Sequence, residues 1–294
     1  MTTAVETPSG KNAATENFPV GSWLLPARLR PHVAVFYAFA RAIDDVADSS
    51  DLPAEEKVRR LEGFAMALTG QHQDAGYEKA VRLRASLLDT NVTTQHGLDL
   101  IAAFKQDAVK LRYKDWDDLM GYCFLSASPV GRYLLDLHGE SRAGYPASDA
   151  LCNALQVLNH LQDCQDDYRQ LNRVYLPQDW LQAAKSTVEE LSAPRSSAGM
   201  RAVIDRCLES TDRLIVLARG LPPQLTSRHL AMESAVIVRI AEKLSALLRR
   251  RDPLAMRVKL SKPAFLGCGL HGIFHGLLTK RPAAASTTVA ARRP

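Results

Sequence analysis

The spacing of apolar residues constrains the fold of this chain more than any other feature. Apolar side chains recur every three to four positions through most of the sequence, and few segments alternate with the period of two that is typical of a strand. Val33, Phe36, Ala40 and Ile43, for example, share one helical face. The pattern predicts an all-α protein.

Several segments have this periodicity, and we expect each to form a helix. They are residues 31–48, 53–68, 77–89, 93–111, 116–138, 148–171, 198–219 and 222–251. Pro129 should kink or split the segment that contains it, because proline inside a helix lacks the N–H donor and clashes with the preceding turn. Residues 143–146, 177–179 and 193–197 have the composition of connections.

We expect a single domain, because no long linker rich in Gly, Ser or Pro interrupts the middle of the chain. With 294 residues, 46% of them hydrophobic, the chain can bury one large core. The helical domain should span residues 16–280. The ends, residues 1–15 and 281–294, are rich in Thr, Ala, Ser, Pro and Arg, which predicts disorder and makes the C-terminal end a basic tail.

The sequence favours a cytoplasmic protein. Residues 1–10 lack the basic start and the apolar core of a secretory signal. The five cysteines form no CxxC pair and are odd in number, which argues against a disulfide framework or a zinc site.

Positive charge gathers toward the C-terminal end of a chain whose formal net charge is +5. This distribution suits an anionic membrane surface or a diphosphate. We expect no nucleic-acid partner, because the basic cluster lacks interleaved aromatic residues and any recognisable binding module. The longest apolar run, residues 264–278, is shorter than the roughly 20 residues needed to cross a bilayer. It should form a core or interfacial helix, which allows peripheral contact with the inner face of the membrane.

Two acidic clusters carry the candidate chemistry. Asp44 and Asp48 lie at the end of the first predicted helix, and Asp163 and Asp167 repeat the same spacing within the segment 148–171. Residues four apart share a helical face, with roughly 5 to 6 Å between them. Each helix therefore presents a carboxylate pair beside its apolar face.

Such carboxylate pairs raise the free energy of the folded state unless a counter-ion lies near them. Two carboxylates about 5 Å apart repel by roughly 3 kcal/mol at an effective dielectric constant near 20, and a helix C-terminus adds unfavourable potential to the first pair. Mg²⁺ takes one or two protein carboxylates and completes its octahedron with waters and phosphate oxygens. Facing pairs could therefore hold Mg²⁺ ions that clamp a diphosphate leaving group. Acids at this spacing are also common on solvated helix faces, so that interpretation stays open for either cluster alone.

A series of motifs in one order resembles the squalene/phytoene synthases, the enzymes that couple prenyl chains head to head. The resemblance covers residues 17–262. Its motifs lie at residues 18–26, 36–48, 122–123, 155–159, 163–167, 173–177 and 257–261. It implies an isoprenoid-synthase-type helical bundle around a central cavity, and an isoprenoid diphosphate as substrate.

The resemblance also implies roles for individual residues. The catalytic residues and ligands of Mg²⁺ would be Asp44, Asp48, Asp163 and Asp167. The substrate-binding residues would be Arg41 and Arg257, near the diphosphate, and Gln156 and Asn159, as polar groups of the cavity wall. Two plainer interpretations stay open: the two amides could join neighbouring helices, and Arg41 could pair with Asp45 one turn away.

Two departures from the family pattern are informative. Gln162 stands where members usually have arginine, so one cation near the phosphates is missing. The pattern Tyr-Cys-x-Tyr-Val-Ala-Gly corresponds to residues 122–128, which read Tyr-Cys-Phe-Leu-Ser-Ala-Ser and are followed by Pro129, so Leu125 takes the place of a phenol. A phenol can relay a proton when the first carbocation is quenched and leucine cannot, which counts against the coupling of two farnesyl diphosphates.

These departures, together with residues 16–20 and 159–164, resemble the HpnC branch of the family in bacterial hopanoid pathways. That resemblance implies a hydroxysqualene synthase: presqualene diphosphate ionises, the cation rearranges, and water captures it. Enzymes of the hopanoid pathway would be partners. The alternatives are a squalene or phytoene-type synthase that couples two prenyl diphosphates, and a non-catalytic helical partner protein with the same fold. Phe36, Tyr37 and Phe124 could stabilise the cation through their rings, although core packing accounts for each as well.

Residues 267–272 match the GxGxxG pattern of dinucleotide-binding folds, but no strand is expected before them and no acidic residue follows for the ribose. The absence of an evident nicotinamide site favours water over hydride as the group that ends the reaction.

Overall fold

The computed structural model describes residues 5, 25–72 and 74–278. Its α-helices, in chain order, are α1 (Arg30–Asp48), α2 (Ala54–Thr69), α3 (Glu78–Thr90), α4 (Gln95–Val109), α5 (Trp116–Ser126), α6 (Ser128–Leu137), α7 (Tyr145–Leu171), α8 (Gln178–Ala183), α9 (Ala198–Ala218), α10 (Leu221–Gln224), α11 (Arg228–Arg250) and α12 (Lys262–Leu278). The all-α prediction is confirmed. Apart from Val5, the termini expected to be disordered lie outside the described residues.

Local sequence explains many of the helix boundaries. Pro31 occupies the first turn of α1, where its missing N–H is not needed. α2 ends at Gly70, whose φ of 83° is a left-handed conformation that glycine adopts without strain. The side chain of Asp115 accepts a hydrogen bond from the N–H of Asp118 and so caps α5.

Two predicted helices are divided in the structure. The segment 116–138 breaks at Ala127, and Pro129 lies in the first turn of α6, as the prediction for this proline required. The prediction of one helix over 222–251 is wrong, because α10 ends at Gln224 and α11 begins at Arg228. The Glu140 carboxylate accepts hydrogen bonds from the N–H groups of Thr226 and Ser227, and these long-range bonds take the place of helical ones.

Two expected connections are partly or wholly regular structure. α7 begins at Tyr145, so the second half of the connection predicted at 143–146 is helical. No loop occupies 177–179, because the strand β2 (Val174–Pro177) leads directly into α8. β2 pairs in parallel with β1 (Arg112–Tyr113), and the sequence did not predict this two-stranded sheet because strands this short have no period to detect.

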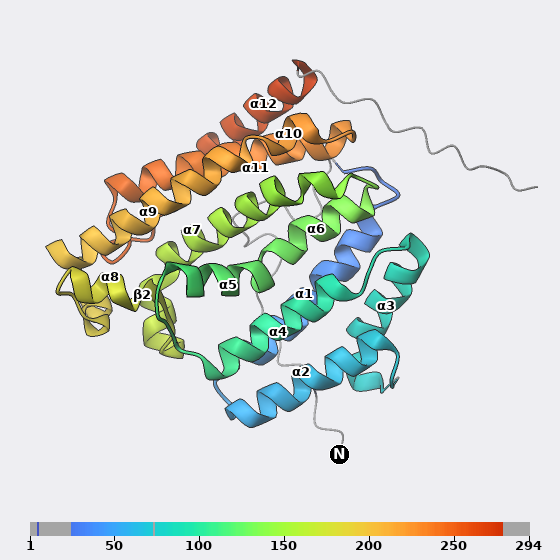
Figure 1. The fold of residues 1–294 in the computed structure, drawn as a ribbon, viewed down its shortest axis with the longest axis horizontal. Helices are drawn as coiled ribbons and strands as arrows, with labels where there is room; N and C mark the ends of the chain where they lie inside the picture. Colours follow the sequence, from blue (N-terminus) through green and yellow to red (C-terminus); the bar gives the residue numbers. More distant parts are fainter. Residues whose placement is uncertain (1–4, 6–24, 73, 279–294) are drawn as a thin grey trace, which may run out of the picture.

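The helices pack around two apolar clusters. One gathers residues of α1 to α4 and α6, and the other gathers residues of α5, α7, α9 and β2. Leu155 of α7 and Leu214 of α9 pack against both clusters, so the two are joined through the centre. Figure 1 shows α2 and α3 along one edge of the molecule and α11 and α12 along the opposite edge.

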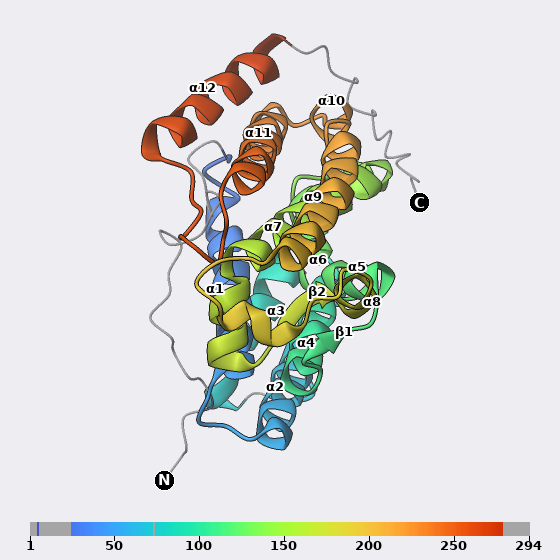
Figure 2. The ribbon, with the colours of Figure 1, turned by 90° about the vertical axis from the view of Figure 1, so that its left-hand side faces the viewer.

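α12 packs along α11 on the outside of the bundle, as Figure 2 shows. Residues 267–272 lie within this helix, so their GxGxxG match does not form a turn between a strand and a helix. Across the described ranges 25–72 and 74–278, we find no helix with both the length and the apolar character that a bilayer crossing requires.

Candidate active site

A cavity of about 370 Å³ lies between α1, α5, α6, α7 and α11. It is acidic at one end, where α1 finishes and α7 carries residues 163–167, and it is mostly apolar elsewhere. The wall includes seven of the eight side chains predicted to form the site: Arg41, Asp44, Asp48, Gln156, Asn159, Asp163 and Asp167. The four aspartates therefore do not point outward on separate surfaces.

The carboxylates of α1 are held by arginines. Arg41 lies 2.8 Å from Oδ2 of Asp44 and 2.7 Å from Oδ1 of Asp45, so the predicted pairing one turn away is present. The arginine also lines the cavity, which leaves it in position to meet a phosphate. The two interpretations of Arg41 are therefore compatible.

The carboxylates of α7 lie on the other side of the acidic end. Asp163 and Asp167 both line the cavity, whereas Asp166 between them is exposed. Nδ1 of His160, one helical turn before the cluster, lies 4.0 Å from Oδ2 of Asp167. Asp163 and Asp167, which lie four residues apart, therefore both face the cavity, as the helical spacing predicted.

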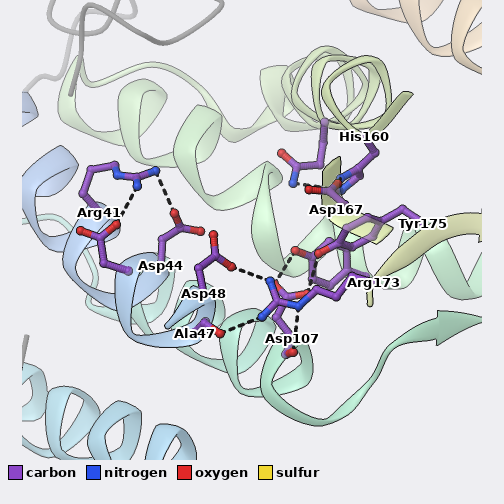
Figure 3. A network of polar contacts seen from close by, with 12 residues as sticks. Arg41, Asp44, Ala47, Asp48, Asp107, His160, Asp167, Arg173 and Tyr175 are labelled. Carbon is purple, nitrogen blue, oxygen red and sulfur yellow. Dashed lines mark hydrogen bonds and ion pairs between the residues drawn. The ribbon is translucent and has the colours of Figure 1, made fainter. Parts of the chain in front are cut away.

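Arg173 connects the acidic end to the core, and sequence reasoning missed it. Its guanidinium donates to Oδ1 of Asp48 at 2.5 Å, to the carbonyl of Ala47 at 2.8 Å and to the carbonyl of Asp107 at 3.1 Å. Figure 3 shows the guanidinium between Asp48 and Asp107. The arginine comes from the motif at residues 173–177, so the signal was present in the sequence, but a lone arginine beside a tyrosine gave no indication of its partners.

Asp107 is a buried carboxylate beneath the site. It is 3% exposed and accepts hydrogen bonds from the hydroxyls of Tyr122 at 2.6 Å and Tyr175 at 2.9 Å. Burial raises its pKa to about 6, although the nearby Arg173 and the two phenols oppose the rise. The group completes a rigid platform under Asp48, because each polar atom of the network has a specific partner.

His160 joins this platform to the polar wall of the cavity. Its ring stacks on Tyr175 with 3.5 Å between ring centroids, and Nε2 lies 3.2 Å from the amide nitrogen of Gln156. Burial, together with the charge of Arg173, lowers the pKa of His160 to about 3, so the ring is neutral near pH 7. A neutral imidazole can accept a hydrogen bond from Gln156 and thereby orient that amide.

Arg257 is the one predicted site residue outside the cavity wall. It is exposed in the segment that follows α11, next to Val258, which is buried. The amide nitrogen of Gln162 donates to the carbonyl of Val258 at 2.6 Å, which ties this segment to α7 beside Asp163. Gln162 is therefore a buried structural link here, and not a residue of the cavity wall.

The residues of the motif at 122–129 that face the cavity are not those that the sequence comparison suggested. Tyr122 and Ser126 line the cavity, whereas Leu125 packs into the second apolar cluster. The expectation that Phe124 could meet a carbocation is wrong, because Phe124 is 43% exposed and lies under the guanidinium of Arg132. Phe36 and Tyr37 do line the cavity, and Phe36 stacks on Tyr133.

Away from the acidic end, the cavity wall contains a further carboxyl group, that of Glu233. Glu233 of α11 lines the wall and is 3% exposed, and its Oε2 has no hydrogen-bond partner among the described residues. Burial raises its pKa to about 8, so the group is mostly protonated near pH 7. A neutral acid preserves the apolar character of this region, and neither composition nor periodicity singled it out.

The donor set at the acidic end suits Mg²⁺. No three acidic, histidine or cysteine side chains of the described residues gather around one point as a ready-made metal cage. Mg²⁺ does not require one, because it binds through one or two carboxylates and takes its other oxygens from waters and phosphates. The two pairs, Asp44 with Asp48 and Asp163 with Asp167, therefore fit ions that are shared with a diphosphate.

The sequence model for squalene/phytoene synthase matches residues 11–264, which include every helix that lines the cavity. The chain belongs to the squalene/phytoene synthase family. It is an enzyme of isoprenoid biosynthesis, and its helical bundle is the fold of that family.

Relatives within the family extend over nearly the whole chain. The chain is 42% identical to the hydroxysqualene synthase of Rhodopseudomonas palustris over 266 residues, which are 90% of each protein. It is 43% identical to the hydroxysqualene synthase of Zymomonas mobilis over 261 residues, 88% of this chain and 87% of the relative. The predicted resemblance to this branch of the family is confirmed.

Solved structures of the family agree with the fold. The squalene synthase HpnC from Alicyclobacillus acidocaldarius superimposes with a TM-score of 0.68 at 30% identity and covers 79% of this chain and 87% of its own. A dehydrosqualene synthase superimposes with a TM-score of 0.76 at 19% identity over 89% of this chain and 92% of its own. The second likeness concerns the fold alone.

Proposed function

We propose that the protein is a hydroxysqualene synthase that ionises presqualene diphosphate and lets water capture the rearranged carbocation, in squalene and hopanoid biosynthesis. The observation that carries the proposal is the cavity itself, in which two facing aspartate pairs close one end of an apolar chamber. The relatives named hydroxysqualene synthase, at 42% and 43% identity, support the choice of product.

Mg²⁺ held by Asp44, Asp48, Asp163 and Asp167 would supply charge neutralisation of the leaving diphosphate. The protein's own groups do the rest. Arg41 lies beside Asp44 and can donate to the diphosphate oxygens, and Arg173 fixes the carboxylate of Asp48. The apolar wall keeps bulk water from the cation until rearrangement is complete.

Loss of the coupling half-reaction belongs to the same proposal. Leu125 packs away from the cavity, so its replacement of a tyrosine does not remove a phenol from the wall. The phenols of Tyr122 and Tyr175 line the cavity and donate to Asp107. The proposed substrate therefore has to be tested against farnesyl diphosphate directly.

The test is to incubate the purified protein with Mg²⁺ and either presqualene or farnesyl diphosphate, without NADPH, and to identify the extracted products by mass spectrometry. The proposal expects hydroxysqualene from presqualene diphosphate and no product from farnesyl diphosphate. Presqualene diphosphate or a phytoene-type product formed from prenyl diphosphates would assign the chain to the coupling enzymes. No turnover of either substrate would leave the non-catalytic partner as the better description.

We also propose a peripheral contact with the inner face of the membrane through α12. Leu266 and Leu270 on this helix are 65% and 64% exposed, and Lys259 and Lys262 at its start are exposed as well. Apolar and basic side chains together suit an anionic lipid surface. Sedimentation with anionic vesicles should carry the wild type down, and the double variant Leu266→Glu, Leu270→Glu should stay in the supernatant. Equal sedimentation of both would reject the contact.

A further inference from the structure

Ser126 has a hydroxyl that the protein does not satisfy. It is the last residue of α5, lines the cavity and is 9% exposed, and its hydroxyl oxygen has no hydrogen-bond partner among the described residues. Buried polar groups without a partner cost free energy and are rare in folded proteins. In the wall of a substrate cavity, such a group points to a bound ligand as its partner.

Contacts of the residues before and after Ser126 show which part of α7 this serine faces. The ring of Tyr122, one turn earlier, lies 6.0 Å from the ring of His160. The hydroxyl of Ser128, just past the break between α5 and α6, donates to Oδ1 of Asn153 at 3.0 Å. Ser126 therefore faces the part of α7 between Asn153 and His160. That part carries Gln156, whose amide also lines the cavity.

This position lies deeper in the cavity than the acidic end. His160 is 4.0 Å from Asp167, and Ser126 is one helical turn, about 6 Å, beyond the tyrosine that contacts His160. Gln156 and Asp163 are seven residues, or about 10 Å, apart along α7, so the phosphate, its ester carbon and one water molecule can lie in line between the aspartates and Ser126. The hydroxyl is thus near the place where positive charge develops.

Two neighbouring serines differ from Ser126. The hydroxyl of Ser234 donates to the carbonyl of Leu230 at 2.7 Å within its own helix. Ser128 is bonded to Asn153 and is not among the residues of the cavity wall. Both already have a hydrogen-bond acceptor.

We propose that the Ser126 hydroxyl holds the water molecule that captures the carbocation, and so sets an alcohol rather than a hydrocarbon as the product. The inference rests on the proposed function and adds a residue that determines its specificity.

The atoms and electrons of the step balance without an oxidant or a reductant. The bond between carbon and the diphosphate oxygen breaks, and both electrons leave with the diphosphate. After rearrangement, the oxygen of the held water gives a lone pair to the cationic carbon and forms the new C–O bond. One O–H bond of that water breaks, and its proton passes to the released diphosphate, the base that the reaction itself generates.

The test compares Ser126→Ala, Ser126→Thr and wild type on presqualene diphosphate with Mg²⁺ and without NADPH. Diphosphate release and the organic products are measured separately, in water enriched in ¹⁸O. The alanine variant should release diphosphate within about threefold of the wild-type rate, while the share of labelled alcohol falls by about tenfold in favour of alkenes formed by proton loss. The threonine variant should retain the alcohol.

Ser128→Ala is the matched control, because it removes a hydroxyl two residues away that does not line the cavity. It should lower stability but leave the proportion of alcohol as in wild type. If the alanine variant at position 126 does not fold, Ser126→Cys decides, since a thiol keeps the size and binds water poorly. An unchanged alcohol share in either variant overturns the role of Ser126. Absence of alcohol from wild type would instead overturn the proposed function.

Discussion

Arg173 donates a hydrogen bond of 2.5 Å to Asp48, a residue 125 positions earlier in the chain. The same guanidinium binds the carbonyls of Ala47 and Asp107, so one cation holds the end of α1 against the platform of Tyr122 and Tyr175. A candidate metal ligand is thereby fixed in direction before any ion arrives. Such preorganisation is expected where a carboxylate has to bind a metal in one geometry.

Replacing Arg173 with glutamine should destabilise the protein. Asp48 and the buried Asp107 would lose their cation, and removing one partner of a buried pair typically costs about 3–5 kcal/mol. Urea unfolding followed by circular dichroism measures the effect. Arg169→Gln is the control, because Arg169 is exposed and donates a hydrogen bond to the carbonyl of Ser192, so the variant should cost about 1 kcal/mol. Equal losses for both variants would refute the structural role of Arg173.

Asp44→Asn and Asp163→Asn should each abolish turnover of the diphosphate substrate while leaving helicity nearly unchanged. An amide keeps the size of the side chain but removes the charge that Mg²⁺ requires, so the rate should fall by roughly two orders of magnitude or more. Asp166→Asn tests the opposite face of the same cluster and should keep wild-type activity, since Asp166 is exposed. Wild-type rates in both inward-facing variants would reject the metal assignment.

Glu233→Gln should change how stability depends on pH. In wild type the unfolded glutamate loses its proton near pH 4.5, whereas burial holds the folded pKa at about 8. Between these values the folded state binds the extra proton, so the free energy of unfolding falls as pH rises through this window, by up to about 5 kcal/mol. The variant lacks this contribution and should lose less stability over the same range.

Urea unfolding of both proteins at pH 5, 6, 7 and 8 measures that difference. Titrating groups common to the two proteins cancel when one curve is subtracted from the other. The advantage of the variant should grow with each step in pH. Parallel curves would mean that the Glu233 carboxyl titrates normally, and hence that it is solvated.

Gln162→Ala should loosen the segment that follows α11. The hydrogen bond from the Gln162 amide to the carbonyl of Val258 ties this segment to α7, and Arg257 and Lys259 beside it are exposed cleavage sites for trypsin. We expect limited proteolysis at these two residues to become about tenfold faster. Gln165→Ala breaks the bonds to the carbonyls of Leu191 and Ala193 instead, and should not change these cleavage rates. Equal rates in the wild type and the Gln162 variant would contradict the link.

Periodicity predicted the long helices well, because α1 and α9 bury one face and begin at local signals such as Pro31 and Ser197. It failed where tertiary bonds compete with the helix. The gap between α10 and α11 depends on Glu140, more than 80 residues away from Thr226, which no local window includes. Helical spacing also identified which aspartates share the cavity, since that choice depends only on the face of each helix.

The other residues of the site could not be predicted from helical spacing. Asp107 was one acid among many in the sequence, and its importance comes from burial beside Arg173, Tyr122 and Tyr175. Leu125 was chosen by alignment to a pattern, but the helix turns that position away from the cavity and turns Ser126 toward it. Glu233 gave no signal, because one acid in an apolar helix is distinctive only when its neighbours are known.

The hydrogen bond from Gln162 to Val258 joins residues 96 positions apart, so it can form only after most of the chain has been synthesised. During translation, α7 is complete well before α11 has been synthesised. Until α11 forms, the cavity lacks one wall and its apolar side chains are exposed to solvent. Chaperones recognise such surfaces during translation. Competence for catalysis therefore arises at the end of synthesis, when the last wall docks.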